Sequence, residues 1–304
     1  MASYKLVTFD AGQGARAGIV VGDMVHDAAE GTGNAKDVSV RGIMNDWAQA
    51  KGRLAKLAAS PKGGRKLSSV KLLPPIPDPI GIFCAGANYT DHVAEMAKAN
   101  NTPMEPDPHT LNLKAWHFIK TAGTLAADHE TVHLPRRSKK IDWEVELVAV
   151  IGKAAKDVPL DKALDYVAGY TIGNDLSARD FHVRPGIPVG SPFRNDWLAH
   201  KSFDQSCPCG PWIVLAEDVG DPQNLKIQLY VNNELMQDSN TKSMIFNIAE
   251  QISHLSEKLT LHPGDLVLTG TPAGVGTPRN KFLQPGDTVR CHIENIGDLE
   301  NKLD

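Results

Sequence analysis

The chain of 304 residues has few cysteines, no large excess of charge of either sign, and no long apolar run. Its four cysteines (Cys84, Cys207, Cys209 and Cys291) lack the paired spacings of a structural zinc site, so we expect reduced thiols. The formal net charge of -4 argues against a general nucleic-acid binder or a protein of anionic membrane surfaces, since both need a cationic footprint. No apolar run approaches the ~20 residues that cross a bilayer, and the first ten residues lack a signal-peptide core. We therefore expect a cytoplasmic protein with neither nucleic acid nor membrane as a partner.

What remains is an ordinary globular composition, with 41% hydrophobic and 22% charged residues. A chain of this length can bury about 75% of its unfolded surface, so it needs no disulfide or metal merely to fold. Residues 4–22 contain two short β-type runs, and residues 41–60 carry apolar positions at helical spacing. Four prolines between residues 73 and 80 forbid a helix there. We predict a small N-terminal α/β domain over 1–72 and a larger domain over 73–304.

Strands outnumber helices in the larger part of the chain. Apolar runs predict strands at 80–85, 143–151, 166–174, 225–232, 265–269 and 287–294. Helical patterns cover 89–100 and 245–259, and the Asn- and Pro-rich residues 100–112 read as a loop. The predicted fold class is therefore α+β and rich in β-structure.

Two carboxylates interrupt the apolar strand at 143–151. Strand alternation places Glu144 and Glu146 on the same face, where they repel each other unless a cation lies between them. A divalent cation would remove that repulsion. The alternative is a solvated face of an edge strand, on which alternating glutamates are common.

A third carboxylate ends the next apolar strand. Asp175 stands at an expected strand-to-helix junction, with Arg179 and His182 four and seven residues later on about the same helix face. An aspartate in such a position is often a helix cap. As ligands, Glu144, Glu146 and Asp175 form a hard oxygen set that suits Mg²⁺ best, with Mn²⁺ or Ca²⁺ as alternatives. A 2-oxo acid could complete the coordination through its carboxylate and keto oxygens.

Other segments offer a base and anion-binding groups. His92 and Glu95 are three residues apart on one helix face, a spacing that suits a base and its orienting carboxylate but also a plain surface pair. Lys120 and Lys201 could hold anions, although single lysines say little. Residues 266–276 form a strand and a Gly-rich turn, which either presents amides to an oxyanion or simply needs positive φ; they do not match a P-loop.

In this order the motifs resemble those of the fumarylacetoacetate hydrolase family, over about residues 80–290. The motifs are Gly-x-Asn-Tyr-x-x-His-x-x-Glu, Glu-x-Glu, Gly-Asn-Asp-x-Ser-x-Arg-Asp, Lys-Ser-Phe-Asp and Thr-Gly-Thr-Pro-x-Gly-Val-Gly. The resemblance implies a fold of stacked mixed sheets and a β-roll, with a variable N-terminal domain and usually a homodimer. Each motif is modest alone, but five in register make coincidence improbable.

The resemblance also implies a role for individual residues. The metal ligands of the family match Glu144, Glu146 and Asp175. Its water-activating pair matches His92 and Glu95, its oxyanion-stabilising lysine matches Lys201, and two positions that contact substrate match Arg179 and Thr271. We add His182 and Lys120 as candidate substrate-binding residues.

The sequence departs from the family's namesake in two places. Ala85 stands where that enzyme has a further acidic ligand, and His182 stands where it has a glutamine. Residues 98–117 are also longer than in compact members. We therefore expect a more open metal site and a different substrate.

The leading hypothesis is a metal-dependent hydrolase that cleaves a carbon–carbon bond in a β-diketo acid of the acylpyruvate or fumarylpyruvate type. His92 would activate water, and a pyruvate enolate would leave. An oxaloacetate decarboxylase or a 2-hydroxy-dienoate isomerase passes through the same enolate and is the alternative. A non-catalytic organic-acid binding protein is a third hypothesis.

Overall fold

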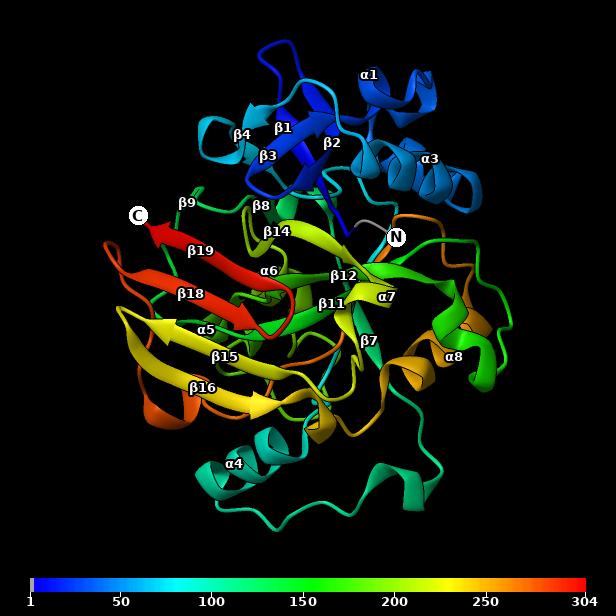
Figure 1. The fold of residues 1–304 in the computed structure, drawn as a ribbon. Coiled ribbons are helices and arrows are strands. Elements are labelled where there is room, and N and C mark those ends of the chain that lie inside the picture. The colour runs from blue at the N-terminus through cyan, green and yellow to red at the C-terminus, as the bar shows by residue number, and fades with distance from the viewer. Residues whose placement is uncertain (1–2) are drawn as a thin grey trace.

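The computed structural model describes residues 3–304 and shows an α+β fold built on three sheets (Figure 1). The largest sheet has 12 strands, and sheets of five and two strands accompany it in the described chain. The largest sheet combines antiparallel pairs with the parallel pair β17 (Leu266–Leu268) and β6 (Ile82–Ala85), and is therefore mixed. The predicted β-rich α+β class is confirmed.

The N-terminal layer is an antiparallel meander covered by helices. Its main elements are β1 (Lys5–Asp10), β2 (Ala15–Val21), β3 (Met24–Asp27), α2 (Val40–Asn45) and α3 (Trp47–Ala59). Strand β1 also pairs with β14 (Cys207–Leu215), with Lys5 opposite Val214, so the large sheet continues across the predicted boundary at residues 72 and 73. The division into two domains stays a prediction.

The central strands of the large sheet carry the site. From β14 the order continues through β12 (Val167–Asn174), β11 (Val145–Ile151), β17 (Leu266–Leu268), β6 (Ile82–Ala85) and β7 (His117–Lys120). Strands β11 and β12 are buried along their whole length, which explains their nearly continuous apolar sequences. The register places Val145 opposite Asn174, so the start of β11 lies beside the end of β12.

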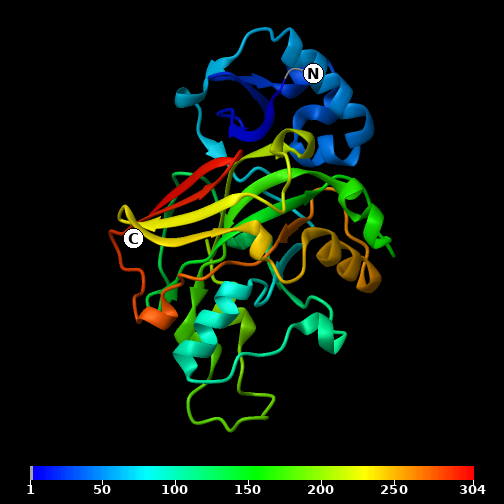
Figure 2. The same ribbon diagram turned by 60° about the horizontal axis from the view of Figure 1, so that its bottom comes forward.

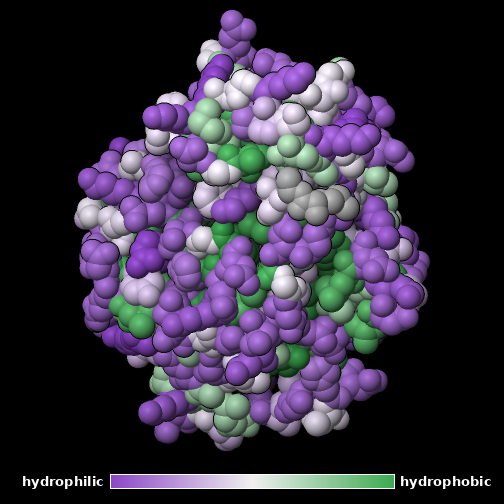
Figure 3. Space-filling model, in the orientation of Figure 1, coloured by the Kyte–Doolittle hydropathy of each residue, from purple (hydrophilic) through white to green (hydrophobic). Residues whose placement is uncertain are grey.

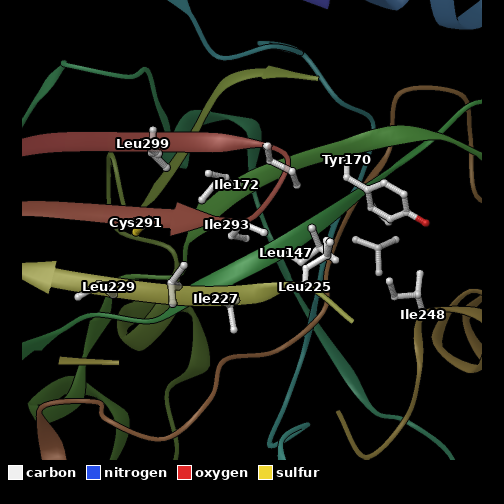
Figure 4. Packing of buried hydrophobic residues seen from close by; sticks show 14 of the residues in the cluster. Leu147, Tyr170, Ile172, Leu225, Ile227, Leu229, Ile248, Cys291, Ile293 and Leu299 are labelled. Carbon is white, nitrogen blue, oxygen red and sulfur yellow. The ribbon is translucent and has the colours of Figure 1, made fainter. Parts of the chain in front are cut away.

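The five-stranded sheet packs on the face of β11 and β12 (Figure 4). Its order is β16 (Glu234–Asn240), β15 (Lys226–Val231), β18 (Thr288–Ile293), β19 (Gly297–Leu303) and β9 (Thr131–Val132). Leu147 and Ile172 of the large sheet lie close to Ile227 and Ile293 of the smaller one in the close-up. This apolar layer holds β11 and β12 in fixed positions, and their ends present the polar residues of the site.

Helices α4 (Thr90–Asn100) and α8 (Ile248–Lys258) match the predicted helices at 89–100 and 245–259. Helix α8 begins with a capping box between Asn247 and Glu250. The predicted helix start at Asp175 is wrong. Residues 177–178 form β13, which pairs with β10 (Ile141–Asp142), and α5 (Arg179–His182) begins only after β13.

The remaining elements are short. They are α1 (Ala28–Thr32), α6 (Trp197–Lys201), α7 (Ala216–Val219), β4 (Arg65–Lys66), β5 (Leu72–Leu73), β8 (Leu125–Ala126), β10 (Ile141–Asp142) and β13 (Ser177–Ala178). The loop between α5 and α6 extends away from the body at the bottom of Figure 2. None of the helices within 3–304 is long and apolar enough to span a membrane, and the face in Figure 3 is mostly hydrophilic.

Candidate active site

Three buried carboxylates converge where β11 and β12 meet. Glu144 precedes β11, Glu146 lies within it, and Asp175 follows β12; their side-chain oxygens lie within 4.8 Å of one another. Antiparallel pairing produces this arrangement, and the Asp175 amide donates to the Glu144 carbonyl at 2.9 Å. The side chain of Asn174 accepts from the Glu144 amide at 3.0 Å. Asp175 is therefore not a helix cap, because α5 begins four residues later.

Cationic side chains pair with two of these carboxylates. Lys201 Nζ donates to Glu144 Oε2 at 2.7 Å and to Asp175 Oδ2 at 2.6 Å. Lys120 Nζ donates to Asp175 Oδ1 at 2.5 Å and also to the carbonyl of Lys201. Arg179 donates to Glu144 Oε1 at 2.5 Å. The three cations come from α6, β7 and α5, so the tertiary fold assembles this cluster.

The cations affect the pKa values of the carboxylates to different extents. Burial alone would raise the pKa of Glu144, but the charges of Lys201 and Arg179 outweigh it and lower that pKa to about 2. Burial raises the pKa of Glu146 well above its usual value, and the charges of Asp175 and Glu144 raise it further. Glu146 accepts one hydrogen bond, from the Gly270 amide at 2.7 Å. Its negative charge is thus the least compensated of the three.

This donor set fits a divalent cation. The three residues supply hard oxygen atoms from carboxylates, which Mg²⁺, Mn²⁺ and Ca²⁺ prefer. Each carboxylate oxygen has a second lone pair, so the hydrogen bonds from Lys201 and Lys120 do not exhaust the capacity of Glu144 and Asp175. A bound divalent cation would also remove the repulsion that raises the pKa of Glu146. Glu144, Glu146 and Asp175 would hold it.

Helix α4 places His92 beside the carboxylates. Burial lowers the pKa of His92 and favours the neutral imidazole, although the charge of Glu144 opposes this effect. Its Nδ1 atom is buried and has no hydrogen-bond partner within residues 3–304. Glu95 instead accepts from the Gly274 amide at 2.7 Å. The role of Glu95 as the residue that orients His92 stays a prediction.

The Gly-rich turn at 269–276 forms hydrogen bonds with side chains of helix α4. Besides the bond from Gly274 to Glu95, the Ala273 amide donates to Asp91 Oδ1 at 3.3 Å. Gly274 has φ of 104°, and a Cβ there would lie 2.1 Å from the Met236 carbonyl oxygen, so this position requires glycine. The amides of the turn therefore hold the helix that carries His92.

Comparison with known proteins agrees with the geometry. The family model described as "Fumarylacetoacetate (FAA) hydrolase C-terminal" matches residues 81–304. The chain belongs to the fumarylacetoacetate hydrolase family. The mitochondrial oxaloacetate tautomerase FAHD2B of Bos taurus is 42% identical over 239 residues, covering 78% of this chain and 70% of the relative. The human oxaloacetate tautomerase FAHD2A is 40% identical over 240 residues, with the same shares covered.

Solved structures of the family are similar over almost the whole chain. A putative HpcE protein from Mycobacterium smegmatis has a TM-score of 0.81 and 31% identity, with 98% of both chains covered. The maleylpyruvate hydrolase of Sphingobium sp. SYK-6, in complex with manganese(II) and pyruvate, has a TM-score of 0.76 and 28% identity, again with 98% of both chains covered. That neighbour thus holds a divalent metal together with a small organic acid.

Asp142 is a site residue that the sequence did not reveal. It is buried, and its carboxylate accepts from the Gly276 amide at 2.6 Å, from the Thr277 hydroxyl at 2.7 Å and from Arg179 Nε at 2.9 Å. Arg179, predicted to bind substrate, is thus held between Asp142 and Glu144. In the sequence, the feature that could have identified Asp142 was a charged residue at the start of an apolar strand.

Gln237 was also missed. It is fully buried on β16, accepts from the Val145 amide at 3.0 Å and donates to Thr271 Oγ1 at 2.9 Å. The Thr271 hydroxyl in turn donates to the Val145 carbonyl at 2.9 Å. Both residues therefore fix the Gly-rich turn against β11. The predicted contact of Thr271 with substrate stays a prediction.

Aromatic rings border the carboxylate cluster. The rings of His182 and His200 stack at 4.6 Å between centroids, and Trp197 packs on His182 at 4.6 Å. Phe118 stacks on Trp197 at 5.5 Å, and Lys201 Nζ lies 5.1 Å from the Phe118 ring centroid. The predicted substrate-binding residue His182 therefore belongs to an aromatic group next to the cations.

Residues 101–116, which we call the strap, run from α4 to β7. His109 lies 3.0 Å from Glu250 of α8, and Lys114 donates to Glu257 of α8 at 2.6 Å. A pocket of about 450 Å³ lies between the strap, the start of α4 and residues 244–246. Trp116 closes one end against Gly86, where a Cβ would lie 1.9 Å from the indole. The long segment noted in the sequence is thus anchored to α8.

Proposed function

We propose that the chain is a divalent-metal-dependent enzyme that interconverts the enol and keto forms of a 2-oxo acid, with oxaloacetate as substrate. The observation that carries this proposal is the buried cluster of Glu144, Glu146 and Asp175, with Lys201 between two of its members and the neutral His92 beside it. Relatives that are oxaloacetate tautomerases support the choice of reaction.

The metal, proposed to be Mg²⁺, would act when bound as a Lewis acid toward the oxygens of the 2-oxo acid and would stabilise negative charge on the keto oxygen. His92 supplies a neutral imidazole that can take the proton from the carbon next to the keto group and give it to the enolate oxygen, and it can carry out the reverse transfer on the enol. Lys201 has three N–H donors and uses two of them on Glu144 and Asp175. The third can donate to an oxygen that gains charge. Arg179, held by Asp142, adds fixed positive charge.

Hydrolysis of an acylpyruvate is the second candidate, favoured by the presence of both His92 and Glu95 on α4 and by the similarity to maleylpyruvate hydrolase. It uses the same stabilised enolate, but it also needs an activated water. For Glu95 to support His92 in that step, its carboxylate would have to leave the Gly274 amide. Dienoate isomerisation and oxaloacetate decarboxylation share the enolate, and decarboxylation is tested together with hydrolysis.

One panel of assays separates these reactions. The loss of enol-oxaloacetate absorbance reports tautomerisation, and pyruvate release from acetylpyruvate, fumarylpyruvate and oxaloacetate reports cleavage or decarboxylation. We expect the loss of the enol form, dependent on Mg²⁺ or Mn²⁺, to be the fastest reaction. We also expect a chelator to suppress it. Pyruvate release from an acylpyruvate at a higher kcat/KM than tautomerisation would reverse the order of the two candidates, and no activity on any member would contradict the proposal.

We also propose that the chain forms a homodimer and acts in the cytoplasm. The four cysteines, free and buried in the described chain, suit a reducing compartment.

Large apolar side chains are exposed on β7, on α6 and on the loop before α6: Ile119 is 67%, Leu198 68%, Phe193 69% and Val189 87% exposed. Such side chains on adjacent elements suit an interface with a second copy.

Light scattering tests the proposed homodimer by measuring its mass. The wild-type chain should have twice the monomer mass at micromolar concentration, and Leu198→Glu combined with Ile119→Asp should shift it to the monomer, because charges would be buried at the interface. Leu164→Glu, at another exposed leucine, is the control and should leave the mass unchanged. A monomeric wild type would contradict the dimer.

A further inference from the structure

Two stacked imidazoles beside the carboxylate cluster lack hydrogen-bond partners. His200 is only 3% exposed, and within the described residues neither of its ring nitrogens has a partner. Nε2 of His182 is buried and equally without one. A neutral imidazole carries one N–H donor and one acceptor, so at least one N–H of His200 is buried and unused. Leaving such a donor unpaired is unfavourable, so a group with an acceptor oxygen suits this place.

The charges nearby indicate the sign of that group. Burial and the charges of Lys201 and Arg179 together lower the pKa of His200 to about 2. Burial and the same two cations lower the pKa of His182. The neutral imidazoles thus lie in a positive potential, opposed only in part by Asp175. An anion with acceptor oxygens suits this place, and a second cation does not.

The rings also pack on one another. Trp197 packs on His182 at 4.6 Å, and Phe118 stacks on Trp197 at 5.5 Å, so the imidazoles belong to a packed group of rings that also includes Trp116. His200 directly precedes Lys201, whose ammonium binds Glu144 and Asp175. The pair therefore lies next to the place where the 2-oxo acid is proposed to bind, and its buried nitrogens can reach a ligand once the exposed Trp197 moves aside.

The charge balance of the site also favours hydrogen-bond donors next to it. Four carboxylates, those of Asp142, Glu144, Glu146 and Asp175, face the three cations Lys120, Arg179 and Lys201. A divalent cation would leave one net positive charge, which matches one substrate carboxylate. A dicarboxylic acid brings a second carboxylate, which needs donors of its own.

We propose that His182 and His200 bind the second carboxylate of a dicarboxylic 2-oxo acid, and so make the enzyme selective for dicarboxylates over their monocarboxylic analogues. This inference rests on the proposed function, because it assumes that the 2-oxo acid end of the substrate lies at the cluster of Glu144, Glu146 and Asp175.

The test compares malate with 2-hydroxybutanoate by calorimetric titration in the presence of Mn²⁺. Both have four carbons and a chelating hydroxy acid end, neither forms an enol, and a methyl group replaces the distal carboxylate in the second. Hydrogen bonds to a charged group contribute about 1.5–3 kcal/mol, so we expect malate to bind about 10- to 100-fold more tightly to the wild type. His200→Phe and His182→Phe keep a stacked ring, and each should weaken malate binding by about tenfold or more. Binding of 2-hydroxybutanoate should stay within about twofold.

His133→Phe, at an exposed histidine outside the site, is the matched control and should change neither affinity. Thermal unfolding of each variant shows whether it is folded, and either histidine variant alone suffices for the test. Equal binding of the two acids by the wild type, or malate binding unchanged in both histidine variants, would overturn the inference and leave the proposed function standing. If the wild type binds neither acid with Mn²⁺ present, the proposed function and this inference both fail.

Discussion

Glu146→Gln is expected to lose binding of Mg²⁺ and Mn²⁺ together with nearly all turnover. The substitution removes one of three carboxylates whose oxygens lie within 4.8 Å of one another, and it keeps an oxygen that can accept from the Gly270 amide. Loss of supporting residues around a metal usually costs 10- to 100-fold in affinity, so loss of a ligand should cost more than about 100-fold. Removal of a Lewis acid that contributes several kcal/mol should lower kcat by roughly 10³-fold or more.

The same substitution should not unfold the protein. Burial, Asp175 and Glu144 all disfavour the charge of Glu146, so a neutral glutamine removes repulsion from the metal-free protein. We expect its metal-free Tm to equal or exceed that of the wild type, and the increase in Tm on adding Mn²⁺ to disappear. Glu234→Gln, which breaks only the exposed pair with Lys281, is the control. Wild-type Mn²⁺ affinity in Glu146→Gln, measured by calorimetry, would remove Glu146 from the metal site.

His92→Ala should separate proton transfer from metal binding. Removing a general base lowers kcat by about 10²–10⁴-fold, and His92 has no hydrogen bond to the three carboxylates in the described chain. We therefore expect the affinities for Mn²⁺ and for oxalate, which mimics the chelating end of a 2-oxo acid, to stay within about twofold. Steady-state kinetics and calorimetry on the same preparation measure both quantities.

Glu95→Gln should have a smaller effect on kcat than His92→Ala. A glutamine oxygen can still accept from the Gly274 amide, so α4 should stay on the Gly-rich turn. The lost charge would weaken support for an imidazolium at His92. His133→Ala, at an exposed histidine, is the control. A wild-type rate in His92→Ala would exclude His92 as the base, and a larger loss in Glu95→Gln than in His92→Ala would point to Glu95 itself.

Much of the fold could be predicted because its central strands are buried on both faces. Strands β11 and β12 have nearly continuous apolar sequences, and α8 has a clear apolar stripe. Strand β14 was missed because Pro208 and Pro211 argue against a strand in the sequence Cys207–Leu215. Strand β16 was missed because its sequence is mostly polar, and only its middle residues are buried.

The candidate site was predictable where a local pattern determines it. Alternation along one strand brings Glu144 and Glu146 together, and the register of β11 with β12 adds Asp175. The roles of Asp142 and Gln237 depend on partners far away in the sequence, at Thr277 and Thr271, and no local pattern reports such contacts. His200 is apparent only from ring packing and from nitrogen atoms without partners.

The anchoring of the strap to α8 limits how far the C-terminal end of α4 can move. Asp107 and His109 begin the anchored part, so only residues 101–106 connect it to the end of α4. Fully extended, those residues span about 20 Å at ~3.3–3.6 Å each. The other end of α4 follows Tyr89, which is fully buried, and His92 is only three residues from it. Inserting Gly-Ser repeats at 101–106 would therefore widen the range of the far end of α4 at little cost in loop entropy and would leave the proposed base close to the carboxylates.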